Sequence, residues 1–170
     1  MFGFLILHHS IMAKVNIGVI GSEKASKDNI FLAQELGREI ARAGAVLICG
    51  GRAGIMEAAS RGCEEEGGIS IGILTSLDER GNQYLTVGLP TSLGFGRNIL
   101  VSSASHVLIA VDGSYGTLSE IAFALNYGRK VVVIEGTGGT ADFMADSPFE
   151  VYKTKSAKEA VAKALELARK

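Results

Sequence analysis

The chain is short of the residues that mark several classes of protein. Its 170 residues include only two cysteines and two prolines, and its 17 basic side chains are balanced by 18 acidic ones. Two thiols, Cys49 and Cys63, are too few for a disulfide framework or a four-ligand zinc site, so we expect a cytoplasmic protein. Nucleic-acid binding usually requires a basic excess, so we expect no nucleic-acid partner.

The N-terminal residues carry an apolar stretch but not the signals of a targeting segment. Residues 2–7 are too few to cross a membrane, and the basic region and cleavage site of a secretory signal are missing. We therefore expect no membrane partner and interpret residues 1–11 as an N-terminal extension that contributes little to the fold. A single Rossmann-like nucleotide-binding domain is expected over residues 12–170. His8 and His9 have no third ligand beside them, so we predict no metal site.

Glycine is the residue in excess, with 22 copies, about twice the usual share of ~7%. Between the glycines, short apolar runs alternate with segments whose apolar residues recur every three or four positions. Strands are predicted at residues 15–20, 45–48, 70–74, 84–87, 106–111, 130–134 and 149–152, and helices at 28–43, 55–66, 96–103, 117–125 and 157–168. This alternation predicts an α/β fold: a single doubly wound, mostly parallel, Rossmann-like sheet with helices on both faces.

Glycine-bearing loops follow four of the predicted strands. In a parallel sheet such loops gather at the carboxyl ends of the strands, where ligands bind. Three of the loops lead towards a helix N-terminus, which offers free N–H groups and a partial positive charge to an anion. A phosphate-bearing ligand is the natural occupant, although tight strand-to-helix turns alone would also call for glycine. The glycines are Gly21, Gly50, Gly51, Gly54, Gly113, Gly116, Gly136, Gly138 and Gly139.

Two common nucleotide-binding motifs are missing. No glycine is followed by Lys-Ser or Lys-Thr, so there is no P-loop, and Gly21 does not begin a spaced glycine triplet. The second predicted strand ends in Cys49 and Gly50, where a nicotinamide enzyme usually has the acid that binds the ribose. These observations argue against NAD chemistry and ATP hydrolysis.

Two motifs resemble those of the LONELY GUY family, whose members were long mislabelled lysine decarboxylases. The run DGSYGTLSE at residues 112–120 resembles the signature Pro-Gly-Gly-x-Gly-Thr-x-x-Glu, and GGRAGIM at residues 50–56 resembles Gly-Gly-Gly-x-x-Gly-Leu-Met. Arg97 precedes the signature at the offset of the family's active-site arginine. The resemblance implies a Rossmann-like, usually dimeric hydrolase of the N-glycosidic bond of nucleoside 5′-monophosphates.

When the catalytic roles of the family are transferred to the matching positions of this sequence, the resemblance implies that Arg97 and Glu120 are the catalytic pair. A carboxylate can stabilise oxocarbenium character and orient water, and an arginine can bind phosphate or stabilise the leaving base. The predicted ligand-binding residues come from the loops after the strands. They are Gly21, Ser22, Gly50, Gly51, Gly54, Gly113, Ser114, Tyr115, Gly116 and Thr117.

The chain also departs from that pattern. Asp112, Ser114 and Arg52 replace a proline and two glycines, and an acid at Asp112 would repel phosphate unless it faces away or caps the turn. The runs FGRNILV at residues 95–101 and GTGGTAD at residues 136–142 are similar to the branch of the molybdenum-cofactor carrier proteins, which bind a phosphorylated pterin.

Three hypotheses follow for the function. The first is a binding or carrier protein for a phosphorylated nucleotide-like ligand, a nucleoside monophosphate or a molybdopterin-type pterin. The second is a phosphoribohydrolase using Glu120 and Arg97, and the third is a purely structural or interaction module. We favour the first. No resident cofactor is expected, the molybdenum cofactor being a candidate cargo, and a homodimer or homotetramer is the expected assembly.

Overall fold

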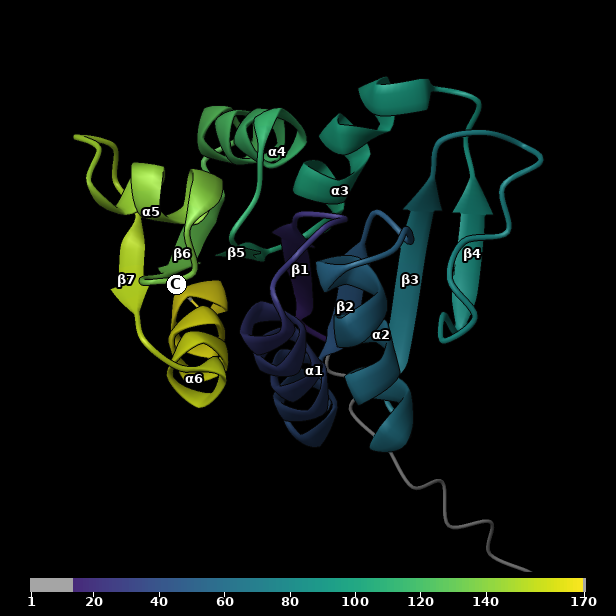
Figure 1. Ribbon diagram of the computed structural model, residues 1–170, viewed down its shortest axis with the longest axis horizontal. Helices are drawn as coiled ribbons and strands as arrows, with labels where there is room; N and C mark the ends of the chain where they lie inside the picture. The colour runs from purple at the N-terminus through teal and green to yellow at the C-terminus, as the bar shows by residue number, and fades with distance from the viewer. Residues whose placement is uncertain (1–13, 170) are drawn as a thin grey trace, which may run out of the picture.

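The computed structural model describes residues 14–169, so the prediction for residues 1–11 lies outside the described part. Strands and helices alternate along the chain (Figure 1). The strands are β1 Asn16–Gly21, β2 Val46–Cys49, β3 Ile69–Leu74, β4 Val87–Pro90, β5 Val107–Val111, β6 Lys130–Ile134 and β7 Tyr152–Thr154. The helices are α1 Lys27–Arg42, α2 Ile55–Glu65, a 3-10 turn η1 Gly94–Arg97, α3 Asn98–Ala104, α4 Tyr115–Asn126, α5 Gly139–Ala145 and α6 Ala157–Ala168.

The strands form one sheet in the order β4-β3-β2-β1-β5-β6-β7, and every pair of neighbours is parallel. Helices α1, α2 and α6 cover one face and α3, α4 and α5 cover the other, each layer over its own buried apolar cluster (Figure 1). Strands β5 and β2 are buried along their whole length, as expected for central parallel strands with helices on both sides. The doubly wound Rossmann-like prediction is confirmed.

Several boundaries differ from the sequence predictions. The strand predicted at residues 84–87 instead begins at Val87, and the one predicted at 149–152 begins at Tyr152. All residues of β4 are exposed, so the strand lacks the buried apolar run that identifies the central strands. Helix α5 was missed because it starts directly after Gly138, within a glycine-rich segment that suggests only a loop.

Two glycines allow α1 and α2 to lie in close contact. A Cβ atom at Gly37 would overlap the backbone oxygen of Ala59, and one at Gly62 would overlap that of Gln34. The pair α1 and α2 packs on the β1–β2–β3 half of the sheet and includes the apolar residues Leu36 and Ile55 of the core. Close helix packing therefore depends on these two positions lacking a side chain.

Gly37→Ala is expected to lower the free energy of unfolding by about 3 kcal/mol, because two backbones must move apart. The matched control is Gly116→Ala, also a glycine in a helix, where a new Cβ has only the Asn98 amide nitrogen near it, at 3.9 Å. That control should be neutral or stabilising by up to about 1 kcal/mol. Urea unfolding of both variants measures the difference, and equal stability of the two variants would contradict the packing argument.

Candidate functional site

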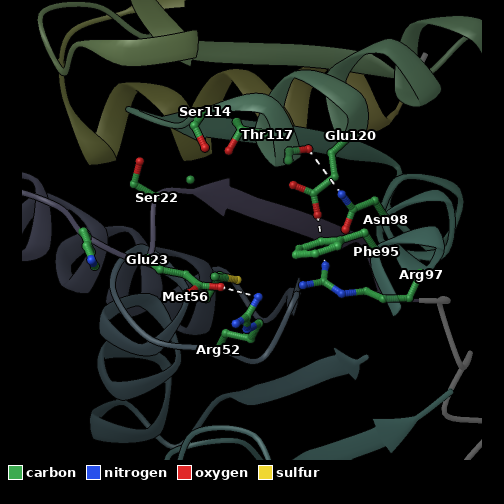
Figure 2. A pocket seen from close by; sticks show the side chains of 13 residues that line it. Ser22, Glu23, Arg52, Met56, Phe95, Arg97, Asn98, Ser114, Thr117 and Glu120 are labelled. Carbon is green, nitrogen blue, oxygen red and sulfur yellow. Dashed lines mark hydrogen bonds and ion pairs between the residues drawn. The ribbon is translucent and has the colours of Figure 1, made fainter. Parts of the chain in front are cut away.

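The candidate site lies where the strand order reverses, between β1 and β5. Beyond the carboxyl ends of the strands is a cavity of about 540 Å³ (Figure 2). This is the position at which doubly wound sheets bind ligands, and the volume lies within the usual range for ligand pockets. The lining residues come from the segments after β1, β2, β4 and β5. They are Gly21, Ser22, Glu23, Lys24, Arg52, Met56, Phe95, Arg97, Asn98, Ser114, Gly116, Thr117 and Glu120.

The first turn of α4 forms one wall of the cavity. Its N-cap, Ser114, makes no side-chain capping bond within residues 14–169, so the N–H groups of the first turn have no capping acceptor. Gly113 has φ +109°, and a Cβ there would lie 2.6 Å from the Thr117 side chain. The Gly113 N–H donates to Ser22 Oγ at 3.1 Å, which joins the loop after β1 to the start of α4. Because Ser22 Oγ accepts this bond, its hydroxyl group can still donate to a ligand, and the uncapped helix end attracts an anion.

A buried ion pair forms a second wall. Arg97 Nη1 donates to Glu120 Oε1 at 3.2 Å, and the two side chains are only 5% and 8% exposed. The guanidinium lies against Gly50, where a Cβ would overlap it, so Gly50 makes room for the arginine. Within residues 14–169, the Arg97 Nε atom is buried without a hydrogen-bond partner. A guanidinium with five donors and one carboxylate partner retains the capacity to bind an anionic ligand.

Burial changes the acidity of this pair. It raises the pKa of the Glu120 carboxyl from its ordinary value of 4.5 to about 7, against the opposing effect of the Arg97 charge. Below about pH 7 the site therefore loses one negative charge, which favours an anionic ligand. A carboxyl group that titrates near neutrality can also exchange a proton with a substrate.

Asn98 fixes the geometry between Arg97 and α4. Its amide nitrogen donates to Ser119 Oγ at 2.9 Å and to the Gly116 carbonyl at 3.3 Å. The side chain is buried, and it links the beginning of α3 to the first turn of α4. This link positions the arginine that precedes it in the chain.

Six lining residues were not among the predicted site residues: Glu23, Lys24, Arg52, Met56, Phe95 and Asn98. Their positions in the chain carried a signal, because each lies next to, or within four residues of, a predicted one. Glu23 and Lys24 follow Ser22, while Phe95 and Asn98 flank Arg97. Arg52 replaces a glycine of the family motif in the sequence, and its side chain enters the cavity (Figure 2).

Five of the predicted ligand-binding residues do not line this cavity. Gly51 lines a neighbouring cavity of about 390 Å³, and Gly54 a small one of about 140 Å³. Tyr115 is 90% exposed and lies outside the main cavity. Gly50 and Gly113 do not line the cavity themselves. Because they lack a side chain, they leave room for the side chains of Arg97 and Thr117, respectively.

The fourth glycine loop is filled by the chain itself. Asp142 accepts hydrogen bonds from the N–H groups of Gly136 at 2.7 Å and Gly138 at 2.9 Å. That loop thus has an internal carboxylate where a phosphate would bind. Asp112 is not among the lining residues, and its carboxylate lies beside Gly139 at the start of α5, where an added Cβ would overlap its Oδ1 atom. The repulsion that its charge would exert on phosphate is therefore reduced.

Within residues 14–169, no cluster of three or more His, Cys, Asp or Glu side chains could hold a metal ion. Both cysteines are buried. Burial raises the pKa of the Cys49 thiol, and it raises the pKa of Cys63 to about 11, so neither is an activated nucleophile. Helices α1 to α6, as described, include none that is both long and apolar enough to span a bilayer.

Comparison with known proteins places the chain in a family. The family model of the SLOG cluster4 family matches residues 14–167, and the chain belongs to this family. An uncharacterised protein of Archaeoglobus fulgidus is 39% identical over 131 residues, which cover 74% of this chain and 87% of that protein.

The solved structures that are similar in both fold and sequence include the following two. The molybdenum cofactor binding protein of Rippkaea orientalis has a TM-score of 0.83 and 32% identity, covering 94% of this chain and 99% of its own. The molybdenum cofactor carrier protein of Chlamydomonas reinhardtii has a TM-score of 0.81 and 33% identity, covering 92% of this chain and 100% of its own. The predicted similarity to the molybdenum-cofactor carrier branch is confirmed.

The raised pKa of Glu120 predicts a pH dependence of stability. In the folded chain the carboxyl keeps its proton up to about pH 7, whereas in the unfolded chain it loses the proton near 4.5. Unfolding therefore releases a proton in this window, and the free energy of unfolding should fall as the pH rises from about 4.5 to about 7, by up to about 3 kcal/mol. Urea unfolding at several pH values measures the slope.

Glu120→Gln should remove this component of the slope, because the amide does not titrate. Glu64→Gln, at an exposed position of α2, is the matched control and should keep the wild-type slope. Identical slopes in the wild type and Glu120→Gln would show that the buried carboxyl does not titrate in this range.

Proposed function

We propose that this member of the SLOG cluster4 family binds and carries a phosphorylated heterocycle of the size of a nucleoside monophosphate. The observation that carries the proposal is the uncapped first turn of α4 in the wall of a 540 Å³ cavity that also contains the buried Arg97. A ligand phosphate would accept hydrogen bonds from the N–H groups of Gly116 and Thr117 and from the Ser22 hydroxyl. Gly21 and Ser114 complete the loops around it.

The charges of the cavity agree with an anionic ligand. Lys24, Arg52 and Arg97 contribute three positive charges, against two carboxylates, Glu23 and Glu120. Protonation of Glu120 near neutral pH increases the positive excess. Phosphate selectivity in this site would come from α4 together with these cations.

A phosphorylated pterin, the organic part of the molybdenum cofactor, is one such ligand. The similarity to proteins described as molybdenum cofactor binding and carrier proteins supports this choice. The residues of the cavity fit a flat ring, because Phe95 and Met56 offer apolar contact. The cofactor would be cargo of this chain rather than a resident group.

Self-association is part of the proposal. Helices α3, α4 and α5 form one layer, and they expose large apolar side chains. Examples are Leu100 at 36%, Leu118 at 36% and Phe143 at 63% exposure. Such a face favours contact with a second copy, as in a homodimer or homotetramer. A cytoplasmic location and the lack of a nucleic-acid partner remain predictions from composition.

Placing a carboxylate on the first turn of α4 tests the phosphate position. Gly116→Asp should weaken AMP binding by about 10-fold or more, because the new charge repels phosphate. A Cβ at Gly116 has room, and an acid at a helix start is stabilising, so misfolding would not explain the loss. Gly116→Asn is the matched neutral control and should bind AMP much more tightly than Gly116→Asp. Isothermal titration calorimetry with AMP measures both; equal affinities would contradict a phosphate at α4.

Phosphoribohydrolase activity is the second candidate. The observation in its favour is the buried Arg97–Glu120 pair inside the cavity, with a carboxyl pKa of about 7. Incubation with AMP and other monophosphates should then release free base and ribose 5-phosphate. Glu120→Gln should reduce turnover by about 100-fold or more while AMP affinity stays level or rises. Unchanged turnover in this variant would show that Glu120 is not catalytic. If the wild type releases neither free base nor ribose 5-phosphate, the hydrolase function is excluded and only the carrier function remains.

A further inference from the structure

The main cavity has a neighbouring cavity with which it shares two lining residues. The second cavity, of about 390 Å³, lies beyond the carboxyl ends of β2 and β3. The two cavities share only two lining residues, Glu23 from the loop after β1 and Arg52 from the loop after β2. These two side chains therefore border both cavities.

Glu23 and Arg52 form an ion pair that bridges the two loops. Arg52 Nη1 lies 2.6 Å from Glu23 Oε1, and Arg52 Nε lies 3.8 Å from Glu79 Oε1. The guanidinium carbon of Arg52 lies 6.0 Å from the centre of the Phe95 ring. Figure 2 shows the contact between Arg52 and Glu23 on the side of the cavity opposite Ser114 and Thr117. Arg52 thus connects the loops that follow β1, β2 and β3.

We propose that the Arg52–Glu23 pair is a partition that limits the length of the ligand, so that the chain accepts a terminal phosphate and excludes a pyrophosphate-linked dinucleotide. The inference rests on the phosphate position proposed above. Glu23 follows Ser22 directly, and its ion pair with Arg52 lies across the cavity from the first turn of α4 (Figure 2). A ligand whose phosphate is bound at α4, and that is long enough to extend across the main cavity towards the second one, would meet the Glu23 carboxylate and the Arg52 side chain.

The second cavity has the chemistry and the size for the other half of such a ligand. It is lined by carboxylates at Glu57 and Glu79, a guanidinium at Arg80 and an amide at Asn82. This mixture of donors and acceptors matches the hydroxyl groups of a sugar. Its volume lies in the range of small-molecule pockets, so a nucleoside could enter once the partition is removed.

We expect that the Arg52–Glu23 pair can be removed by mutation without loss of the fold. The side chains of Arg52 and Glu23 are 33% and 41% exposed, and exposed ion pairs contribute little to stability. Neither residue belongs to the buried core. A truncation of Arg52 should therefore change the ligand range rather than the folded state.

Two probes of equal charge test the partition. AMP and diadenosine diphosphate, which consists of two AMP units joined through their phosphates, are both dianions at pH 8 and differ in length. In the wild type, diadenosine diphosphate should bind at least about 10-fold more weakly than AMP. Arg52→Ala should reduce this ratio by about 10-fold or more, since the loss of the Arg52 charge affects two dianions alike. The control is Arg42→Ala, which removes an arginine paired with Glu39 and Glu66 outside both cavities, and should keep the wild-type ratio.

An unchanged ratio in Arg52→Ala, with AMP still bound, would overturn the partition. A wild type that binds neither probe would instead count against the proposed function. In that case the ligand-free crystal structure of Arg52→Ala decides the partition: one continuous cavity from Ser22 to Asn82 supports it, and two separate cavities overturn it.

Discussion

The reversal of strand order between β1 and β5 is the constraint on which the site depends. Because all neighbouring strands are parallel, the loops after β1, β2 and β5 emerge at one edge of the sheet. Strand β1 leads to a helix on one face and β5 to a helix on the other, which leaves a crevice between the two loops. The bond from the Gly113 N–H to Ser22 Oγ joins the loops across this crevice, and the first turn of α4 forms its wall.

The buried Arg97–Glu120 pair places a guanidinium and a titratable carboxyl group in the wall of this crevice. A buried ion pair costs desolvation energy and is weak evidence for stability by itself. Here the pair lies in a cavity wall, and Gly50 makes room for the guanidinium by lacking a side chain. The arginine has more donors than its carboxylate partner uses, and the carboxyl titrates near neutrality. Both features suit reversible binding of an anion.

The sequence alone predicted the fold because the central strands are continuous apolar runs between amphipathic helices. The edge elements were harder to predict: β4 is wholly exposed, and α5 begins inside a glycine loop. For the site, the glycine positions pointed to the edge of the sheet at which the cavity lies. They could not separate the loop before the uncapped helix α4 from the loop filled by Asp142. The partition made by Arg52 could not be predicted either, because it depends on a contact between residues from two different loops.

The most direct test of a phosphate site at α4 is a crystal structure of the protein with millimolar AMP. The account predicts electron density for the phosphate within hydrogen-bond distance of the Gly116 and Thr117 N–H groups and of Ser22 Oγ, with the remainder of the nucleotide in the 540 Å³ cavity. A phosphate bound elsewhere on the chain, or an empty cavity at that concentration, would contradict it.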